Sequence, residues 1–364
     1  MPHIAILDYV GKKAGMNDYD RGLATALVKK GAEVTVYSNF DEPTFSKASF
    51  VNCFPDGNFS NPVTMIQFLI RFNRVLQDCK RKNVDVVLLH IFNFSGITYR
   101  LIRRAKRKGL KVFVIVHDVE SLIENDSAYA DKILAEAKEV FLHNEFSKQE
   151  LIRLTGTKVE LTIFPHGHFL DVPDRFPSIK DPEVDKSSTG FTLLFFGMIK
   201  PSKGIDLLIE AMSQLPEDIH LIIAGRVRNL NANQLRKKIK NFKLEDRIQF
   251  EEGYVTDEQR HIYFNKAEAI VLPYLKIYQS GVLMLALSYG LPVVISDLVP
   301  NKEIIQDDVN GYLFSSGSVE SLVKTILKMR NDSFRENKIQ SGKDFIINHH
   351  DWSMAAEKII DKCH

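Results

Sequence analysis

The sequence predicts an α/β protein made of two doubly wound domains. Short apolar runs of strand length alternate with segments of helical periodicity along most of the 364 residues, which is typical of parallel sheets covered by helices. The alternation is interrupted at residues 171–190, where three prolines and several charges occur without hydrophobic periodicity. We therefore expect domains at residues 1–170 and 191–350, a linker at 171–190, and a C-terminal helix at 351–364 that returns to the first domain.

In the first domain, a strand, a glycine-containing loop, a helix and a second strand open the chain. Gly11 and Gly15 lie in the loop, Leu23 and Leu27 are spaced for one helix face, and Gly31 ends the helix. Such a crossover makes the two strands parallel. The fingerprint GxGxxG of dinucleotide-binding oxidoreductases is absent. Two interpretations of the glycine-containing loop therefore remain, a flexible loop and a loop that binds a ligand. The predicted strands cover residues 4–7, 34–37, 84–90, 112–116, 140–142 and 159–163, and the predicted helices cover residues 19–30, 65–82, 97–108 and 146–154.

The second domain repeats the pattern, and its most informative part runs from residue 271 to 296. There Pro273 stops a strand, a polar loop follows, Ser280 and Gly281 open a helix, and Gly290 closes it. A helix start at the carboxyl end of a parallel strand favours a phosphate, although a plain helix cap explains the same residues. The other predicted strands cover residues 192–196, 219–224, 248–250, 269–272 and 293–295, and the other predicted helices cover residues 205–212, 235–240, 256–265 and 352–362.

The composition describes an ordinary globular protein, in which 45% of the residues are hydrophobic, 26% are charged and the net charge is +2. Cys53, Cys79 and Cys363 lie far apart, which argues against a disulfide framework or a zinc site and suits a reducing cytoplasm. The N-terminus lacks the basic region and cleavage site of a signal peptide, and no apolar run approaches the roughly 18 residues of a membrane span. We expect a cytoplasmic protein.

Positive charge is concentrated between residues 60 and 111. This segment contains twelve Lys and Arg against two Asp, and much of the charge falls on two successive predicted helices. Cations in a last helical turn suit the helix dipole, but two basic helices exceed what that effect requires. We expect an anionic membrane surface or an anionic acceptor as the partner, with peripheral association at the inner face of the membrane. The segment shows no aromatic-interleaved platform for reading bases, so nucleic acid is not expected.

Titratable residues follow two predicted strands of the first domain. His117, Asp118 and Glu120 come directly after one strand, and His143 comes directly after the next. Open α/β sheets bind ligands at the carboxyl ends of their strands, so His117 is a candidate site residue. The alternative is a helix cap made by Asp118 beside a solvated histidine.

From Phe196 to Gly204 the chain reads FGMIKPSKG, and this loop resembles the retaining GT-B glycosyltransferases of family 4, group 1. Members often carry Gly-x-x-Arg/Lys-Pro-x-Lys-Gly after the first strand of the second domain. In the first domain the resemblance is looser, resting on the glycine loop, GAEV at 31–34, HD at 117–118 and PHG at 165–167. Through the second domain it continues as IAG at 223–225, EGYV at 252–255, LPY at 272–274, YQSGV at 278–282, GLPVV at 290–294, EII at 303–305 and NGYL at 310–313.

The resemblance implies a GT-B fold, with two Rossmann-like domains facing a central cleft that holds a nucleotide-sugar donor. Cations and a helix N-terminus aimed at the diphosphate would stabilise it as it departs. No cofactor is implied beyond the donor, which is a substrate. The implied residues are Gly15, Lys200, Lys203, Ser280, Gly281 and Val282 for the diphosphate, Arg226, Gly253, Tyr254 and Val255 for the base and ribose, His117, Tyr278 and Gln279 for the sugar, and His117, Lys200 and Lys203 as catalytic residues.

Asp18 and Asp20 imitate the Asp-x-Asp metal motif of the other glycosyltransferase fold. They stand at the start of a predicted helix, where capping is the expected role. We therefore expect no essential metal.

The sequence departs from the family at two acidic positions. Many members carry two glutamates eight positions apart around the phosphate-binding helix, one on the sugar and one on the ribose. The corresponding residues here are Ile277 and Leu285, or Tyr278 if one residue is dropped. A subset of the family carries Gln-Ser-Gly-Val instead. The change concerns the recognition of the ribose and sugar hydroxyls, and therefore the choice of donor.

These observations favour a retaining enzyme that moves a hexose-type sugar from a UDP-sugar, in preference to a GDP-sugar, to a lipid-linked or saccharide acceptor. Synthesis of a surface polysaccharide or glycoconjugate is the expected setting. One alternative is a nucleotide-sugar 2-epimerase-like enzyme on the same fold; a phosphorylase would need a much longer chain. The other is a degenerate scaffold that partners a glycosyltransferase. The missing glutamates favour the scaffold, and the retained Lys200, Lys203, Ser280 and Gly281 speak against it.

Overall fold

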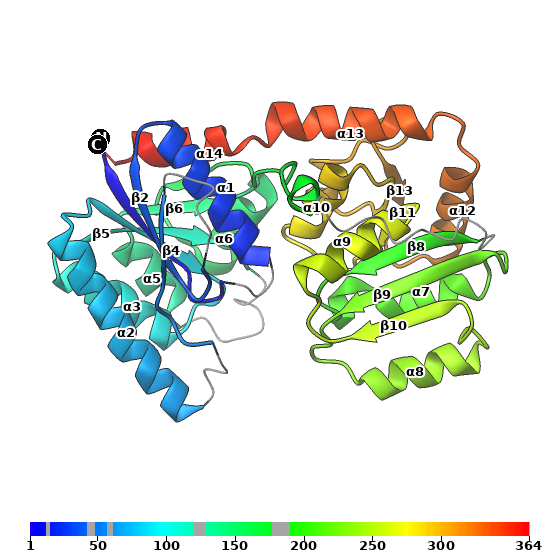
Figure 1. Ribbon diagram of the computed structural model, residues 1–364, viewed down its shortest axis with the longest axis horizontal. Coiled ribbons are helices and arrows are strands. Elements are labelled where there is room, and N and C mark those ends of the chain that lie inside the picture. The colour runs from blue at the N-terminus through cyan, green and yellow to red at the C-terminus, as the bar shows by residue number, and fades with distance from the viewer. Residues whose placement is uncertain (12–14, 42–47, 57–60, 120–127, 177–189, 364) are drawn as a thin grey trace. The chain divides into compact units, whose positions relative to one another are not determined.

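The computed structural model describes residues 1–364 except 12–14, 42–47, 57–60, 120–127, 177–189 and 364. The chain divides into two compact units. Unit 1 comprises Met1–Gly167 and His350–His364, and unit 2 comprises His168–His349. Each unit is built around its own parallel sheet (Figure 1). Most of the predicted linker at 171–190 lies outside the described residues.

Within the described residues, the sheet of unit 1 has seven strands in the order β3-β2-β1-β4-β5-β6-β7. All neighbouring strands pair in parallel. Because β1 pairs with both β2 and β4, the connections leave in opposite directions at that point, which is the switch point of a doubly wound sheet. The strands are β1 (His3–Leu7), β2 (Glu33–Ser38), β3 (Ser49–Asn52), β4 (Val86–Ile91), β5 (Lys111–Val116), β6 (Glu139–Leu142) and β7 (Leu161–Ile163).

Helices cover both faces of this sheet, with α1 and α14 on one face and α2 and α3 on the other (Figure 1). This arrangement follows from right-handed crossovers that run in opposite directions from the switch point. Helix α2 begins after Asn61, whose side chain accepts a hydrogen bond from the Val63 N–H. The helices are α1 (Met16–Lys29), α2 (Pro62–Arg81), α3 (Gly96–Arg107), α5 (Ala130–Glu136), α6 (Glu145–Thr155) and α14 (Trp352–Asp361).

Trp352 anchors α14 within unit 1. Its ring packs edge-on against Tyr19 of α1, with the ring centroids 4.7 Å apart. A Cβ at Gly22 would come within 2.2 Å of the Trp352 ring, and one at Gly167 within 2.0 Å. Both glycines are therefore needed for the indole to reach its place beside α1.

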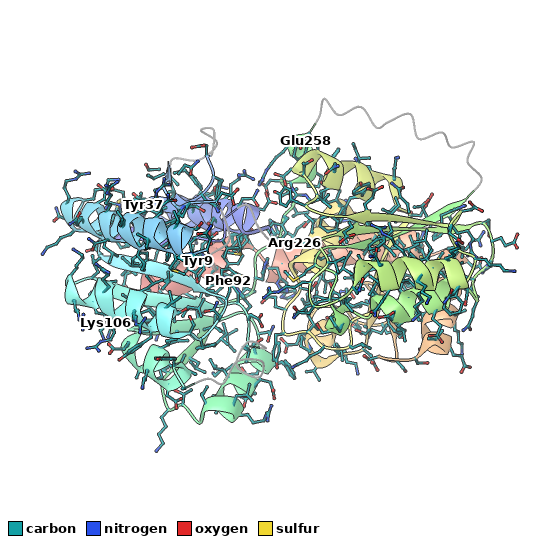
Figure 2. All side chains as sticks on the ribbon, turned by 90° about the horizontal axis from the view of Figure 1, so that it is seen from below. Tyr9, Tyr37, Phe92, Lys106, Arg226 and Glu258 are labelled. Atoms are coloured by element: carbon teal, nitrogen blue, oxygen red, sulfur yellow. The ribbon has the colours of Figure 1, made fainter. Side chains whose placement is uncertain are left out.

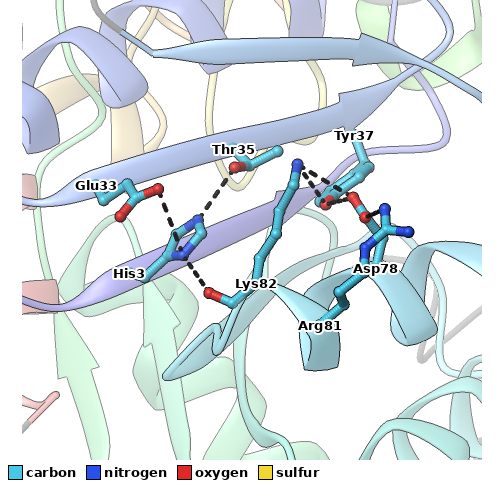
Figure 3. A network of polar contacts seen from close by, with 7 residues as sticks. All are labelled: His3, Glu33, Thr35, Tyr37, Asp78, Arg81 and Lys82. Atoms are coloured by element: carbon cyan, nitrogen blue, oxygen red, sulfur yellow. Dashed lines mark hydrogen bonds and ion pairs between the residues drawn. The ribbon is translucent and has the colours of Figure 1, made fainter.

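A polar network ties the amino end of β1 to β2 and to the end of α2 (Figure 3). The His3 ring contacts Thr35 Oγ1 through Nε2 at 3.1 Å and the Lys82 carbonyl through Nδ1 at 3.2 Å. Tyr37 donates to Asp78 at 2.6 Å, and Lys82 Nζ lies 3.1 Å from the same carboxylate.

Within the described residues, unit 2 has six parallel strands in the order β10-β9-β8-β11-β12-β13, so its switch point lies between β8 and β11. Apolar side chains such as Leu193, Phe195 and Ile209 fill a continuous core against the sheet. The strands are β8 (Phe191–Phe196), β9 (Ile219–Gly225), β10 (Ile248–Glu252), β11 (Ala269–Leu272), β12 (Val293–Ser296) and β13 (Tyr312–Phe314).

The helices of unit 2 form two packed sets, in which α7 contacts α8 and α12, and α10 contacts α9 and α13. Helix α9 begins with a capping box between Thr256 and Gln259. No helix in the described part of the chain is long and apolar enough to span a membrane. The helices are η2 (Pro173–Arg175), η3 (Pro201–Lys203), α7 (Ile205–Met212), α8 (Ala232–Asn241), α9 (Asp257–Lys266), α10 (Gly281–Tyr289), α11 (Val299–Lys302), α12 (Val319–Arg330) and α13 (Arg335–His349).

Candidate functional site

The loops after β8 and β11 meet at the switch point of unit 2. The Ser202 carbonyl accepts hydrogen bonds from the N–H groups of Leu275 at 2.9 Å and Lys276 at 3.2 Å. Gly204 has a φ of 68°, and a Cβ there would lie 1.8 Å from the Pro273 carbonyl oxygen. Only glycine fits such an approach, so the two loops form one continuous backbone surface.

Lys203 is placed on this surface by an aromatic ring. Its Nζ lies 3.8 Å from the centroid of the Tyr274 ring, within the range of a cation–π interaction. Tyr274 is buried, and its hydroxyl lies 3.0 Å from Ser280 Oγ. The lysine is thus connected, through one ring and one hydrogen bond, to the residue that caps α10.

The N-terminus of α10, which Tyr274 contacts through Ser280, presents N–H groups that have no acceptor within the helix. Ser280 Oγ accepts a hydrogen bond from the Leu283 N–H at 3.2 Å. By helix geometry the N–H groups of Gly281 and Val282 have no acceptor within α10, and both residues are partly exposed. A cation beside a helix N-terminus is suited to a phosphate.

Two buried polar atoms border the same loops. Gln279 Oε1 and Ser202 Oγ have no hydrogen-bond partner among the described residues. Buried polar atoms are normally paired, so an orphaned one at a candidate site is consistent with a partner supplied by a ligand. Tyr278 is buried, and Lys276 Nζ lies 5.6 Å from its ring centroid.

The residues predicted for the base and ribose follow the next two strands of the same sheet. The Arg226 carbonyl accepts a hydrogen bond from the Ile199 N–H at 2.9 Å, and the Gly253 N–H donates to the Gly225 carbonyl at 3.0 Å. Arg226 and Tyr254 have exposed side chains, and Val255 is partly exposed. Lys200 directly precedes η3, and Lys203 ends it. The structure therefore places every predicted site residue of unit 2 on the loops at one edge of one sheet or at the start of α10.

The carboxyl edge of unit 1 holds a different group of side chains, which we call the histidine–aspartate cluster. Its four histidine rings surround Tyr19 of α1, and Asp8, His117 and His143 each directly follow a strand. All but His117 are buried. The cluster consists of Asp8, Tyr19, Asp20, His90, His117, His143 and His166.

His117 is held by the ring of His90. His90 Nδ1 lies 2.7 Å from His117 Nε2, and His90 Nε2 lies 3.0 Å from Asp20 Oδ1. Phe92 stacks on the His117 ring, with the centroids 4.9 Å apart and the planes inclined by 11° (Phe92 is labelled in Figure 2). His117 thus has one fixed ring plane and one fixed ring nitrogen.

Burial sets the protonation of the cluster. Desolvation raises the pKa of Asp8 and of Asp20 to about 8, and it lowers the pKa of His90 and of His166 to about 4. The same cause, reinforced by the neighbouring histidines, lowers the pKa of His117 well below its ordinary value. At neutral pH the histidines are uncharged, and the raised pKa of Asp8 and of Asp20 favours the protonated form of each carboxyl group.

The expectation that Asp18 and Asp20 cap a helix is wrong. Helix α1 begins at Met16, and its N-cap is Gly15, with a left-handed φ of 74°. Asp18 forms an ion pair with Arg21 at 2.9 Å, whereas Asp20 is buried beside His90. No group of three or more His, Cys, Asp or Glu in the described residues has the geometry of a metal site.

Sequence reasoning singled out His117 but not the residues that contact its ring. Asp8 and His90 were not singled out, although Asp8 directly follows β1 as His117 follows β5, and His90 is the last residue but one of β4. A Cβ at Gly15 would meet nothing within 4 Å. Residues 12–14 of its loop, and Glu120 beyond His117, lie outside the described residues.

Comparisons with known proteins cover both units. The family described as glycosyl transferases group 1 matches residues 178–359, and glycosyltransferase family 4 matches residues 14–171. The chain is 29% identical over 177 residues to the phosphatidyl-myo-inositol mannosyltransferase of Mycobacterium leprae. That match covers 47% of this chain and 46% of the mannosyltransferase, so it spans about half of each protein.

Solved structures share the architecture along the whole chain. Sucrose-phosphate synthase from Thermosynechococcus elongatus superimposes with a TM-score of 0.75 at 15% identity, covering 99% of this chain and 98% of that one. HepE from Anabaena, solved with UDP and glucose, gives a TM-score of 0.74 at 16% identity, covering 99% of both chains. With two Rossmann-like parallel sheets and family matches on both halves, the chain has the GT-B fold and belongs to the group 1 glycosyltransferases.

Proposed function

We propose that the protein is a retaining glycosyltransferase that transfers a hexose-type sugar from a UDP-sugar to a lipid-linked or saccharide acceptor. The observation that carries this proposal is the arrangement at the switch point of unit 2, where Lys203 lies over Tyr274 and beside the capped N-terminus of α10. This arrangement suits an anionic group that approaches the ends of β8 and β11.

The proposed role of these groups is to stabilise the leaving diphosphate. Negative charge builds up on the nucleoside diphosphate as the bond from its oxygen to the sugar carbon breaks. Lys203 and the N–H groups of Gly281 and Val282 are held in place before the reaction, so together with Lys200 they would stabilise that charge more than they stabilise the bound donor. With these cations in place, we propose that the transfer needs no metal.

The configuration at the anomeric carbon is retained if the acceptor enters on the face of the sugar from which the diphosphate leaves. The acceptor oxygen bonds to the anomeric carbon while the phosphate oxygen departs, and the acceptor proton passes to that departing oxygen. No enzymic carboxylate is required for this step. This agrees with the two switch-point loops, because residues 197–204 and 273–280 contain no Asp or Glu.

The donor is proposed to be a UDP-sugar rather than a GDP-sugar, and the Anabaena HepE complexes with UDP support that choice. Arg226, Gly253, Tyr254 and Val255 would lie by the base and ribose. Ile277 and Leu285 stand where many relatives of this family carry glutamates, so the hydroxyls are assigned to Gln279, Tyr278 and His117. These apolar residues are also what favours the second candidate, a scaffold that binds a glycosyltransferase without turnover.

An anionic membrane is the proposed location of a lipid-linked acceptor, at the inner face. On α2, the side chains of Val63, Ile66 and Ile70 are 61%, 58% and 49% exposed, and they share a helical face with Arg74. Apolar side chains beside cations are typical of helices that lie on membrane surfaces. On α3 the charge is partly neutralised, because Lys106, labelled in Figure 2, donates to Glu136 at 2.7 Å.

Binding of UDP to the Lys203→Ala variant tests the donor site. A hydrogen bond to a charged group contributes about 1.5–3 kcal/mol, so UDP affinity should fall roughly 10- to 150-fold by calorimetry without added metal. Lys240→Ala, an exposed lysine of α8, is the matched control and should bind as the wild type does. Equal affinity in the two variants would show that the site is misassigned, and no UDP or GDP binding to the wild type would favour the scaffold.

Membrane association is tested separately by vesicle sedimentation. The wild type should sediment with vesicles that contain anionic lipid, and Ile66→Ser with Ile70→Ser should reduce the bound fraction. Equal binding to neutral vesicles would contradict an electrostatic contribution.

A further inference from the structure

The loops at the carboxyl edge of unit 2 carry more positive charge than a nucleoside diphosphate requires. These loops are the segments between each strand and the α-helix that follows it, residues 197–204, 226–231, 253–256, 273–280, 297–298 and 315–318. Their lysines and arginines are Lys200, Lys203, Arg226, Arg228 and Lys276, against Asp297 as their acidic residue. The Asp297 carboxylate accepts a hydrogen bond from the Ser316 N–H at 2.9 Å. Because each phosphate of a nucleotide-sugar brings one negative charge, cations remain for a further anionic group.

Lys276 is held at this edge through its backbone. Its N–H donates to the Ser202 carbonyl at 3.2 Å, and the Leu275 N–H donates to the same carbonyl at 2.9 Å. Ser202 lies between Lys200 and Lys203 in sequence. The loop that carries Lys276 is therefore attached to the loop that carries the two lysines proposed for the diphosphate, while the side chain of Lys276 remains partly exposed.

Lys276 repeats the arrangement of Lys203. Its Nζ lies 5.6 Å from the ring centroid of Tyr278, as Lys203 Nζ lies 3.8 Å from that of Tyr274, and both rings are buried. Each tyrosine thus provides a fixed aromatic face for one ammonium group. An ammonium group has three N–H donors, so donors on the side away from the ring can bind an anion. The residues before α10 therefore contain two lysine–tyrosine pairs, and the diphosphate has been assigned to the first.

We propose that Lys276 is a specificity-determining residue that binds a carboxylate on the transferred sugar, so that the preferred donor is a UDP-hexuronic acid rather than a UDP-hexose. This inference rests on the proposed function, which takes the diphosphate to lie at the N-terminus of α10. The sugar is bonded to the distal phosphate, and Tyr278 and Gln279, which directly precede the cap residue Ser280, are the residues proposed for it. The ring of Tyr278 is the one over which Lys276 lies.

Charge gives the selectivity its direction. A hexuronic acid differs from the corresponding hexose by a carboxylate in place of a hydroxymethyl group. An ammonium group binds an ionised acceptor more strongly than a neutral hydroxyl, because the hydrogen bond is then assisted by charge on both partners. Residues 273–280 contain no Asp or Glu that would repel the carboxylate. The loop therefore favours the anionic sugar.

Calorimetry with two matched pairs of donors tests the proposal on the full-length protein. The pairs are UDP-glucuronic acid with UDP-glucose, and UDP-galacturonic acid with UDP-galactose, so each comparison keeps the configuration of the ring hydroxyls. A hydrogen bond between charged groups should make the acid bind roughly 10- to 150-fold more tightly than its neutral partner in at least one pair. Equal affinities within both pairs would overturn the proposal.

Substitution of Lys276 assigns the preference to this side chain. Lys276→Gln keeps a polar side chain but removes the charge, so the preference for the acid should fall to less than about threefold. Lys276→Arg keeps the charge and can still lie on the Tyr278 ring, so it should retain most of the preference. Lys240→Gln, on the exposed surface of α8, is the matched control and should behave as the wild type. An undiminished preference in Lys276→Gln would overturn the proposal.

UDP alone separates this inference from the proposed function. UDP lacks the sugar, so Lys276→Gln should bind it about as tightly as the wild type does, which also shows that the variant is folded. Equal weakening of UDP and of the UDP-hexuronic acid would place Lys276 on the diphosphate and overturn its assignment to the sugar. Wild-type protein that binds UDP without preferring either acid refutes the inference alone. Absence of UDP binding in the wild type refutes the proposed function and the inference with it.

Discussion

The two units of this protein share a topology but not the chemistry of their functional edges. Each sheet places its first strand in the middle and reverses its connections beside it. In unit 1 the carboxyl edge carries buried carboxyl and imidazole groups, such as Asp8, Asp20 and His90. In unit 2 the corresponding edge carries lysines, glycines and the N-terminus of α10.

The difference shows how one architecture can be given two binding properties. Burial makes the histidines of unit 1 neutral at pH 7, so they act as hydrogen-bonding groups of fixed polarity. Lys203 instead places its amino group over the face of the Tyr274 ring, whose hydroxyl contacts the N-cap residue of α10. The sheet supplies the position in both cases, and the side chains beyond the strand ends supply the chemistry.

Glycines also serve different purposes in the two units. In unit 2 they let backbones touch, since a Cβ at Gly225 would lie 1.7 Å from the Gly197 carbonyl oxygen. In unit 1, Gly22 and Gly167 make room for the indole of Trp352. The edge of unit 2 should therefore be the more sensitive to added methyl groups.

Gly204→Ala should produce the largest effect. The new methyl group would meet the Pro273 carbonyl, and the left-handed backbone would be strained as well, so we expect a loss of about 3–5 kcal/mol in the free energy of unfolding. UDP affinity should fall with it, because the loop that carries Lys203 would separate from the loop that carries Tyr274. Denaturant titration and calorimetry measure the two quantities.

Gly156→Ala is the matched control. Gly156 has a φ of 64°, close to the 68° of Gly204, but a Cβ there would meet nothing within 4 Å. The substitution should lower the free energy of unfolding only by the backbone strain, about 1–2 kcal/mol. Equal destabilisation by the two substitutions would show that the contact between the loops contributes nothing.

Much of unit 2 could be predicted because its signals are local. Helix α7 was predicted with the observed ends, and Ser280 and Gly290 cap α10 as expected. The site residues also lie in short contiguous motifs, so their positions at one sheet edge follow once the strands are placed. The family assignment from these motifs is confirmed by the matches on both halves of the chain.

The support of His117 could not be predicted from local signals. Asp20 reaches His90 across 70 positions of sequence, and nothing in the sequence around either residue specifies that contact. One weak signal was available, since Asp8, His117 and His143 each directly follow a strand. Strand ends in a parallel sheet converge on one edge, so recurrence of such residues predicts a cluster there.

Strands β3 and β13 and helices α12 and α13 were missed for different reasons. Leu322, Ile326 and Met329 of α12 are buried with helical spacing, so that helix was detectable. Helix α13 buries only Gly342 and Ile346 among its residues and shows little periodicity. Short strands such as β13 contain three residues, too few for a pattern.

The pH dependence of stability should show the neutral histidines of unit 1. Between pH 6.5 and about 4 the unfolded chain binds a proton at His166 that the folded protein does not, so stability falls as the pH falls through this range. His166→Gln removes that difference and should reduce the loss between pH 7 and pH 4 by about 3 kcal/mol. Denaturant titrations of both proteins at the two pH values give the double difference.

Comparing each protein with itself at pH 7 removes the packing cost of the substitution, because His166 is uncharged there in both states. The carboxyl groups of Asp8 and Asp20 act in the opposite direction, since their raised pKa makes stability fall as the pH rises from about 4 towards 8. Both proteins contain these carboxyl groups, so their contribution cancels in the double difference. If His166→Gln lost as much stability between pH 7 and pH 4 as the wild type, the buried imidazole would already be charged in the folded protein.

Tyr274→Phe should produce the smallest effect and separates the ring of Tyr274 from its hydroxyl. The ring under Lys203 is kept, so UDP affinity should change less than about twofold, while loss of the hydrogen bond to Ser280 should lower the free energy of unfolding by about 1 kcal/mol. Tyr274→Leu, which removes the ring as well, should weaken UDP binding several-fold further. If Phe and Leu weaken UDP equally, the hydroxyl rather than the aromatic face positions the cation, and the edge of unit 2 would then depend on hydrogen bonding as much as the edge of unit 1 does.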